Sequence, residues 1–572
     1  MKRKSVWLFG LLLVQTLLLL WVSWATSPGW DEWAHLPSGL YTLQYGDHSP
    51  YCVNPPLTRL WCAIPVWLAG GGIEYEPLGQ STGFRPEWVL AGLYGFQRGE
   101  AVFFWTSLAR TTVIPIALLG TWLIFCIGRR LFSERTAWVA ATLWVFSPTV
   151  LTFGAAITPD VSAAVFGFWA AWCNYVWLKL PRRRTAAWLG VSLGLALLSK
   201  ASWLILPPLL ILIGLAEAWQ RGAAWWSRER WIQTGLVIAT SYFVVHAAYD
   251  FRGMLVPMGE FEFVSQALSG HDATDQTVGG RIGNRFRDSW WHYLPAPLPA
   301  NYMIGIDLQK LDFEGKFQSY FWGQHRDVGW WSYYVIGIWL KEPVALWILV
   351  IGGLVTTLAS LRQFRAVSRI KWRGRLLVLL PGVALLLFVS SQTGFNHHLR
   401  YVLPFLPGLY LLCAACINWR TRWSIPMVVV LLFWYAGSSL SIMPRSYAYF
   451  TEAIGGTSHG WKYLGNSNLD WGQDLLTIKR WVAENPDKRP VFVVYDPEIV
   501  EYGKLGIDAR SGSSMVTPAG PTHRGWWIVG AAKMLKQPHV WFRDQPPFEQ
   551  LSVTTTVYDY SNGIPTESQH VR

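Results

Sequence analysis

The chain has 572 residues, of which 52% are hydrophobic, 16% aromatic and only 15% charged. Soluble domains carry roughly 25% charged residues, so this composition excludes an ordinary soluble protein and indicates a membrane protein. The formal charge of +13 does not indicate a nucleic-acid partner, because the Lys and Arg residues form short clusters between apolar runs. The 38 Trp residues fit the same class, since indole prefers the two membrane interfaces.

Long apolar segments recur from the amino terminus to about residue 443. A membrane-spanning helix needs about 20 apolar residues, and about eleven segments approach that length. They are residues 5–25, 107–127, 137–156, 161–180, 186–199, 202–218, 232–249, 335–359, 376–391, 402–418 and 424–443. The first follows Lys2-Arg3-Lys4 and exceeds the apolar core of a signal peptide, so we interpret it as an uncleaved signal anchor. We therefore predict an α-helical multi-pass membrane protein with about eleven transmembrane helices.

The basic clusters set the predicted orientation. A cytoplasmic amino terminus places Arg129-Arg130 and Arg182-Arg183-Arg184 inside, as the positive-inside rule requires. Three large pieces then fall outside the cytoplasm: loop 26–106, loop 250–333 and tail 444–572. We predict two domains, namely a transmembrane domain over residues 1–443 and an extracytoplasmic soluble domain over residues 444–572. The tail combines a helix-like stretch at 472–484 with apolar runs at 491–495 and 526–530, which predicts a small α/β domain.

Carboxylates lie at two predicted outer positions. Asp31 and Glu32 follow the first apolar segment, where reduced dielectric raises a carboxylate pKa, although an acidic pair at a helix start is also an ordinary cap. Asp160 follows Thr158-Pro159 in a tight outer turn. A carboxylate at the edge of a membrane segment is costly unless it is functional or paired, and helix capping by Asp160 is the simpler alternative.

Two cations lie on the same predicted side, against the usual charge preference. Lys200 and Arg400 both occupy outer turns between apolar segments, where a cation suits a lipid phosphate. Snorkelling toward the headgroups is the alternative for Lys200. The adjacent His397 and His398 would need a third clustered ligand to form a metal site. We assign no metal ligands and no definite cofactor, and the sequence leaves a divalent cation requirement open.

Several short motifs occur in the order typical of one enzyme family. They are Asp31-Glu32 with His35, Asn54-Pro55-Pro56-Leu57, Thr158-Pro159-Asp160, Lys200, Gly329-Trp330-Trp331 running to Lys341-Glu342-Pro343, Arg400-Tyr401 with Pro404, and Asn466-Ser467-Asn468-Leu469-Asp470-Trp471-Gly472-Gln473-Asp474. With them the chain resembles the GT-C glycosyltransferases, in the bacterial branch similar to protein O-mannosyltransferases and the lipid A aminoarabinose transferase. It has Asn54 where the family commonly has His.

The resemblance implies roles for individual residues. Asp31 is implied as the catalytic base, Glu32 as its support and Asp160 as a second active-site carboxylate. Lys200 and Arg400 are implied as ligands of the carrier phosphate. We add four candidate substrate-binding residues, His35, Asn54, His397 and His398. The tail motif around Asp470 lacks the Trp-Trp-Asp-Tyr-Gly signature of oligosaccharyltransferases, so we interpret it as a turn that docks the tail onto the membrane core.

The predicted function is an inverting glycosyltransferase at the extracytoplasmic face of the inner (plasma) membrane. Its expected partners are a polyprenyl-phosphate-linked sugar donor, a protein, lipid or glycan acceptor and the bilayer, with no nucleic acid. A lipid-modifying or oligosaccharide transferase on the same scaffold is the nearest alternative. A transporter or flippase of lipid-linked sugars and a non-catalytic scaffold remain alternatives. Transporters favour charges at mid-membrane, whereas the notable carboxylates here lie in outer loops, which favours an enzyme.

Overall fold

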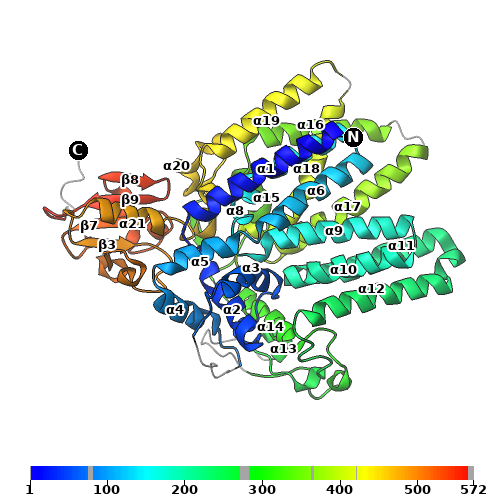
Figure 1. Ribbon diagram of the computed structural model, residues 1–572, viewed down its shortest axis with the longest axis horizontal. Helices are drawn as coiled ribbons and strands as arrows, with labels where there is room; N and C mark the ends of the chain where they lie inside the picture. Colours follow the sequence, from blue (N-terminus) through cyan, green and yellow to red (C-terminus); the bar gives the residue numbers. More distant parts are fainter. Residues whose placement is uncertain are drawn as a thin grey trace.

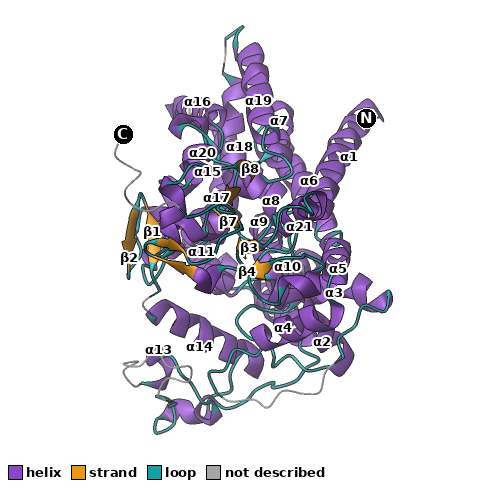
Figure 2. Cartoon of the chain, turned by 90° about the vertical axis from the view of Figure 1, so that its left-hand side faces the viewer, coloured by secondary structure: helices purple, strands orange, loops and turns teal. Residues whose placement is uncertain are grey.

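Helices make up most of the molecule, and strands gather in the tail (Figures 1 and 2). The structure is a computed structural model that describes residues 2–74, 82–270, 282–315, 317–362, 366–419 and 421–564. Its first twelve helices are α1 (Lys2–Ala25), α2 (Glu32–Tyr45), α3 (Leu57–Leu68), α4 (Glu87–Arg98), α5 (Ala101–Arg110), α6 (Ile114–Leu131), α7 (Glu134–Phe146), α8 (Pro148–Phe153), α9 (Pro159–Lys179), α10 (Arg183–Ser199), α11 (Leu206–Arg221) and α12 (Arg228–Ala247). The later ones are α13 (Gln266–Ser269), α14 (Ala300–Glu314), α15 (Tyr333–Lys341), α16 (Val344–Arg362), α17 (Ala366–Ser391), α18 (Leu406–Ala414), α19 (Ser424–Leu440), α20 (Thr457–Gly460) and α21 (Leu475–Glu484).

Several helices are suited to a membrane. Among the described residues, six are long and apolar enough to cross one, or seven if α15 and α16, which meet at a 115° bend, form one span. The chain is therefore a multi-pass membrane protein, and the count of eleven spans stays a prediction. Two of the predicted segments are broken: 137–156 divides into α7 and α8 at Pro148, and 335–359 bends where Pro343 separates α15 from α16. Proline interrupts a helix because it lacks an N–H and clashes with the preceding turn.

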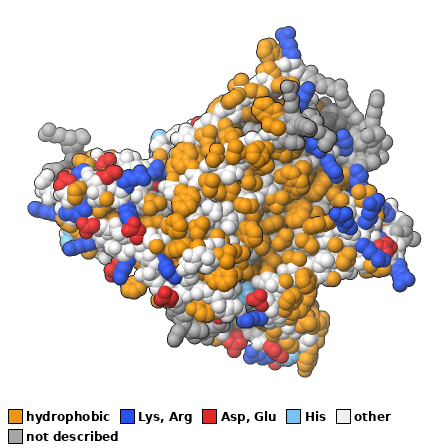
Figure 3. Space-filling model, viewed as in Figure 1, with side chains coloured by type: hydrophobic (Ala, Val, Ile, Leu, Met, Phe, Trp, Pro, Cys, Tyr) orange, Lys and Arg blue, Asp and Glu red, His pale blue; other side chains and the backbone are white. Residues whose placement is uncertain are grey.

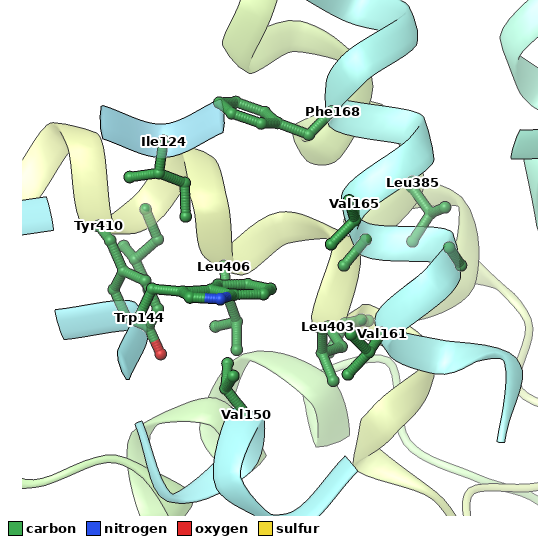
Figure 4. Packing of buried hydrophobic residues seen from close by; sticks show 14 of the residues in the cluster. Ile124, Trp144, Val150, Val161, Val165, Phe168, Leu385, Leu403, Leu406 and Tyr410 are labelled. Atoms are coloured by element: carbon green, nitrogen blue, oxygen red, sulfur yellow. The ribbon is translucent and has the colours of Figure 1, made fainter. Parts of the chain in front are cut away.

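The helical core packs around a large aromatic side chain. Trp144 of α7 is fully buried, and Figure 4 shows its indole among side chains from α6, α8, α9 and α18. Its Nε1–H donates to the Ala117 carbonyl at 3.1 Å, so burial leaves no unpaired donor. Gly120 lies directly against the indole, since an added Cβ there would be 2.8 Å from Trp144. This close packing joins α6, α7 and α9, and the first turn of α9 carries the candidate site residue Asp160.

The surface shows how the charges are distributed. Hydrophobic side chains cover the helical part of the face seen in Figure 3, which is the surface expected next to lipid. Lys and Arg side chains gather at the end of the helices opposite the sheet, whereas acidic side chains are most visible on the sheet and the loops near it. The basic end of the helices and the sheet thus lie at different ends of this face (Figure 3).

The tail contains a small sheet with one amphipathic helix. Its strands are β3 (Val491–Val494), β4 (Arg510–Ser511), β7 (Trp526–Gly530), β8 (Glu549–Ser552) and β9 (Thr555–Asp559), in the order β4-β3-β7-β9-β8. Strand β3 pairs in parallel with both β4 and β7, while β9 is antiparallel to β7 and β8. Shorter pairs are β1 (Ser319–Phe321) with β2 (Gln324–Arg326) and β5 (Val516–Thr517) with β6 (Gly520–Pro521). The predicted apolar runs form the buried central strands β3 and β7, as a covered parallel pair requires.

Hydrogen bonds join the tail to the first outer loop. The backbone N–H of Trp30 donates to the Trp471 carbonyl at 2.8 Å, and that of Ser27 donates to the Gln473 carbonyl at 3.1 Å. The Ser27 hydroxyl also donates to the Gly472 carbonyl at 2.7 Å. The motif around Asp470 therefore docks the tail onto the helical core, and it places Trp471 next to the start of α2.

Candidate functional site

A cavity of about 480 Å³ lies where the outer loops, the ends of several spanning helices and the tail meet. The predicted site residues in its wall are Asp31, Asn54, Asp160, Lys200, His397, His398 and Arg400. These residues come from segments hundreds of positions apart in the chain. Glu32 and His35 are the two predicted site residues that do not line the cavity, for reasons given below. The roles of all nine remain predictions.

Asp31 forms an ion pair with Arg400. Asp31 directly precedes α2 but makes no capping hydrogen bond to it; instead, its Oδ2 accepts from Nη2 of Arg400. Burial raises the pKa of Asp31, but the Arg400 guanidinium outweighs burial and brings this pKa down to about 2. Asp31 is therefore anionic at neutral pH. Its side chain is 21% exposed, against 5% for Arg400, so the carboxylate is the more accessible partner.

Asp160 forms a second ion pair, with Lys200. The N-cap of α9 is Thr158, so Asp160 does not cap this helix. Its Oδ1 accepts instead from Nζ of Lys200 at 2.5 Å, and its Oδ2 lies 3.6 Å from Nε of Arg400. Lys200 is 4% exposed and its ammonium lies 4.2 Å from the centre of the Tyr401 ring. Lys200 therefore points into the protein, which contradicts the snorkelling alternative.

The two pairs leave some bonding capacity unused. Within the described part of the chain, Nε and Nη1 of Arg400 and Oδ2 of Asp160 are buried without a hydrogen-bond partner. Because orphaned buried polar groups are costly, their presence in a cavity wall indicates a site prepared for a polar ligand. The indole of Trp471 lies 4.6 Å from the Arg400 guanidinium and holds it by a cation–π contact. The free N–H groups of Arg400 suit an additional anion.

Glu32 is bound on the opposite side of the helix start from Asp31. Oε1 of Glu32 accepts from Nε of Arg110 at 2.8 Å and from the backbone N–H of Ile157 at 2.7 Å. Oε2 accepts from Nη2 of Arg110 at 2.5 Å and from the Gly29 N–H at 2.7 Å. All four contacts are buried, so no lone pair faces the cavity. These contacts hold the turn that carries Asp31, and the supporting role of Glu32 in catalysis stays a prediction.

His35 lies behind the cavity wall rather than in it. Its Nε2 is 3.4 Å from the Tyr51 hydroxyl, which also accepts from Nδ2 of Asn54 at 3.1 Å. Burial lowers the pKa of His35 to about 3, so the ring is neutral. Arg59 donates to the carbonyls of Tyr51 and Asn54 and fixes their loop. Asn54 lines the cavity, whereas His35 contacts the wall residue Tyr51, and the substrate-binding role of both residues stays a prediction.

The two adjacent histidines face different partners. Nε2 of His397 is 2.7 Å from the Gln318 carbonyl, and Nδ1 of His398 is 2.5 Å from the Ser467 hydroxyl. Their rings are perpendicular, with centres 5.8 Å apart. Burial, followed by the nearby Arg400, lowers the pKa of His398 well below its usual value. Across the described residues, no group of three His, Cys, Asp or Glu side chains is arranged to hold a metal ion.

Sequence reasoning missed three residues of the cavity wall. Tyr401 lies beneath Lys200, Trp471 contacts Arg400, and Asp470 comes from the docked tail. The Asp470 Oδ1 accepts from the Tyr495 hydroxyl at 2.7 Å. Burial, followed by the nearby Asp474 carboxylate, raises the pKa of Asp470 well above its usual value. The tail motif was the available signal, but its sequence did not show which side chain would point inward.

An apolar groove opens beside the charged cavity. It has a volume of about 450 Å³ and shares Lys200, Gln309, Phe313 and Tyr401 with the cavity wall. The remaining lining is mainly apolar and comes from the short helix Ala201–Ile205, α11, α14 and α17. It includes Leu204, Ile205, Pro208, Ile306, Phe388 and Val389. Lys200 thus lies where the apolar groove meets the polar cavity, and Arg400 lines the polar cavity.

Comparison with known proteins gives one family match and several similar structures. Residues 105–249 match the family model described as dolichyl-phosphate-mannose-protein mannosyltransferase. The predicted resemblance to the GT-C glycosyltransferases is thereby confirmed. Over these residues, about a quarter of its length, the chain is similar to mannosyltransferases of this family. No curated protein sequence matches it.

Three solved structures are similar to this chain at low identity. ArnT from Cupriavidus metallidurans in the apo state is 12% identical, with 99% of this chain and 100% of that chain covered and a TM-score of 0.45. ArnT from the same organism bound to undecaprenyl phosphate is 13% identical, with 96% and 97% covered and a TM-score of 0.46. The archaeal oligosaccharyltransferase AglB from Archaeoglobus fulgidus, in complex with an inhibitory peptide and a dolichol-phosphate, is 10% identical, with 93% and 70% covered and a TM-score of 0.45.

Proposed function

We propose that this enzyme transfers a sugar from a polyprenyl-phosphate carrier to a hydroxyl-bearing protein, lipid or glycan at the extracytoplasmic membrane face. One observation carries the proposal: Asp31, Asp160, Lys200 and Arg400, from four distant segments, meet in one cavity that adjoins an apolar groove. A donor of this kind has a charged phosphate between a polar sugar and an apolar chain. The cavity, the cations and the groove offer matching surroundings in the same order.

In the proposed reaction, the acceptor oxygen attacks the anomeric carbon of the sugar from the face opposite the phosphate. The new carbon–oxygen bond forms as the bond from that carbon to the phosphate oxygen breaks, and polyprenyl phosphate leaves with the electron pair. Asp31 receives the proton of the acceptor hydroxyl, as general base. Lys200 and Arg400 stabilise the charge that develops on the phosphate. The configuration of the sugar is inverted by this single displacement.

The ion pair between Asp31 and Arg400 connects donor binding to base strength. A carboxylate with a pKa of about 2 is a weak base. A donor phosphate that takes up the free N–H groups of Arg400 competes with Asp31 for the same guanidinium. The pKa of Asp31 then rises toward its ordinary value, because its main stabilising charge is shared with the phosphate. Donor binding would in this way prepare the base for the acceptor.

The base assignment is tested by replacing Asp31 with Asn and measuring sugar transfer in membranes. We expect turnover to fall by about 10²–10⁴-fold, the usual contribution of a general base. Asp508→Asn is the matched control, because Asp508 is 84% exposed on the tail. Unchanged turnover in a correctly inserted Asp31→Asn enzyme would remove Asp31 from this role.

The phosphate assignment needs a separate measurement. Lys200→Gln should raise the donor concentration needed for half-maximal rate by about tenfold or more, since a charge-assisted bond contributes about 1.5–3 kcal/mol. Lys504→Gln, on the exposed tail surface, is the control. Donor dependence equal to that of the wild type would refute the assignment of Lys200 to the phosphate.

A further inference from the structure

A second cavity lies beside the first one, and its volume of about 660 Å³ is larger. Its walls come from the β1–β2 hairpin, from Trp461 and Lys462, and from the tail segment around Lys536 and Arg543. Lys536 lines both cavities, so the two spaces adjoin. None of the proposed donor contacts uses this second space.

The side chains of this cavity carry charge of one sign. Lys462, Lys536 and Arg543 line it, and no described Asp or Glu does. Among the described residues, neither lysine forms an ion pair, and Arg543 has only Asp544, at 3.7 Å. The Asp544 side chain is 72% exposed, so this contact contributes little neutralisation. Three cations without matching carboxylates form a concave surface of positive potential, which attracts an anion.

The cavity is held in shape by bonds between its walls. The Tyr320 hydroxyl donates to the Trp461 carbonyl at 2.7 Å, and Nε2 of His325 lies 2.9 Å from the Leu535 carbonyl. These contacts join the hairpin to both other walls. The centre of the Trp461 ring lies 5.3 Å from the Arg543 guanidinium and 5.5 Å from the Lys462 ammonium. Lys462 and Arg543 therefore lie around one aromatic ring.

We propose that this cavity binds an anionic group, a phosphate or a carboxylate, on a saccharide acceptor. The proposal rests on the proposed function, because the acceptor must reach Asp31 in the adjoining cavity. An anion held by Lys462, Lys536 and Arg543 would direct the rest of the acceptor past Lys536 toward Asp31. The enzyme would thereby select acceptors that carry negative charge at a distance from the reacting hydroxyl. This selection is separate from recognition of the donor phosphate by Lys200 and Arg400.

Binding to the purified full-length enzyme tests the proposal, with glucose 1-phosphate, glucuronate and glucose as probes in calorimetric titrations. The test variant replaces Lys462, Lys536 and Arg543 with Gln. The control variant replaces three exposed tail cations with Gln and changes the net charge equally; these are Lys504, Arg510 and Arg524. If the cavity prefers phosphate, glucose 1-phosphate should bind most tightly. If it prefers carboxylate, glucuronate should bind most tightly. Uncharged glucose should not bind in either case.

We expect the test variant to bind the preferred anion at least about tenfold more weakly than the wild type, and the control variant to bind it as the wild type does. The donor site can also take a phosphate, so the titration is repeated with Lys200→Gln. Binding that survives Lys200→Gln and is lost in the test variant supports the second site. Binding that is lost with Lys200→Gln and kept in the test variant overturns it, as does equal loss in the control variant.

A kinetic measurement separates this proposal from the proposed function. Release of sugar from a polyprenyl-phosphate donor to water requires the donor site but no acceptor. The test variant should release sugar at the wild-type rate, while its transfer to an anionic acceptor falls. Absence of any donor cleavage by the wild type would refute the proposed function and leave the binding result standing. Parallel loss of donor cleavage and transfer in the test variant would overturn the acceptor site.

Discussion

Replacing Glu32 with Gln should destabilise the enzyme without removing its chemistry. The Glu32 and Arg110 side chains are 0% and 1% exposed, and the carboxylate accepts four buried hydrogen bonds. An amide retains one oxygen and directs its NH₂ group at two N–H donors, so two of the four bonds are lost. Arg110 also loses its countercharge. Removing one partner of a buried ion pair costs about 3–5 kcal/mol, which is a large share of the stability of a folded protein.

Replacing Asp31 should reduce turnover more than stability. Asp31 accepts one charge-assisted bond from Arg400 and is partly exposed, so Asp31→Asn should cost less, about 1.5–3 kcal/mol. The assay compares the apparent melting temperature in detergent with the turnover per folded molecule, and Glu484→Gln on the exposed surface of α21 is the control. Glu32→Gln should melt lower and keep most of its turnover, whereas Asp31→Asn should lose turnover. A Glu32→Gln enzyme that melts like the wild type and is inactive would refute this division of roles.

Three further results are expected. Trp471→Ala should weaken donor use several-fold and Trp471→Phe less so, because a cation–π contact with Arg400 contributes about 0.5–2 kcal/mol; equal donor dependence in both variants would contradict this. In pH profiles, kcat/KM should show no acid limb from Asp31 until the pH approaches its pKa of about 2, since the base is active when deprotonated. The acid limb of kcat should lie at higher pH than that of kcat/KM, and coincident limbs would argue against competition for Arg400. Asp474→Asn should expose the tail to limited proteolysis, because Oδ1 of Asp474 accepts from Arg445 and Oδ2 from three hydroxyls, all within the tail. Wild-type resistance would show that these bonds do not stabilise the fold of the tail.

The general plan of the molecule could be predicted from the sequence because a bilayer imposes simple rules. Apolar length predicts helices, and charges in turns indicate sidedness. Lys200 and Arg400 stood out as cations on the unexpected side, and both line the cavity. The apolar runs of the tail likewise form β3 and β7. The sequence thus allowed a prediction of the type of each element and of the end of the molecule at which each charged group lies.

The pairing of the charged groups could not be predicted. Asp31 and Glu32 are adjacent, yet one pairs with Arg400 and the other with Arg110. Successive residues at a helix start point in directions about 100° apart. Two adjacent acidic residues can therefore pair with different arginines. Arg110 does indicate a buried partner, since a charged residue inside an apolar stretch requires one. The acidic residue with which Arg110 forms its ion pair depends on long-range packing.

The number of spans was also beyond sequence reasoning. Hydropathy averages over a window and does not register a sharp bend, so residues 335–359 resembled one straight helix. At the bend, Glu342 accepts hydrogen bonds from Ser147, Thr149, Tyr410 and Tyr435. These donors come from α7–α8, α18 and α19, and they satisfy the carboxylate at the break. Such compensation is visible only once the helices are assembled.

The docking of the tail has a consequence for biogenesis. Ser27 and Trp30 emerge first from the ribosome, yet their partners lie about 440 positions later, and the ammonium of Lys341 is held by the carbonyls of Tyr447 and Asn468. At translation rates of about 5–20 residues per second, the nascent loop waits for roughly 20–90 s. The carbonyl partners of Lys341 follow it by 106 and 127 positions, so for about 5–25 s a partly made chain holds an uncompensated ammonium. Premature termination or slow export of the last hundred residues should therefore send the whole polypeptide to membrane quality control, rather than release a shortened but functional enzyme.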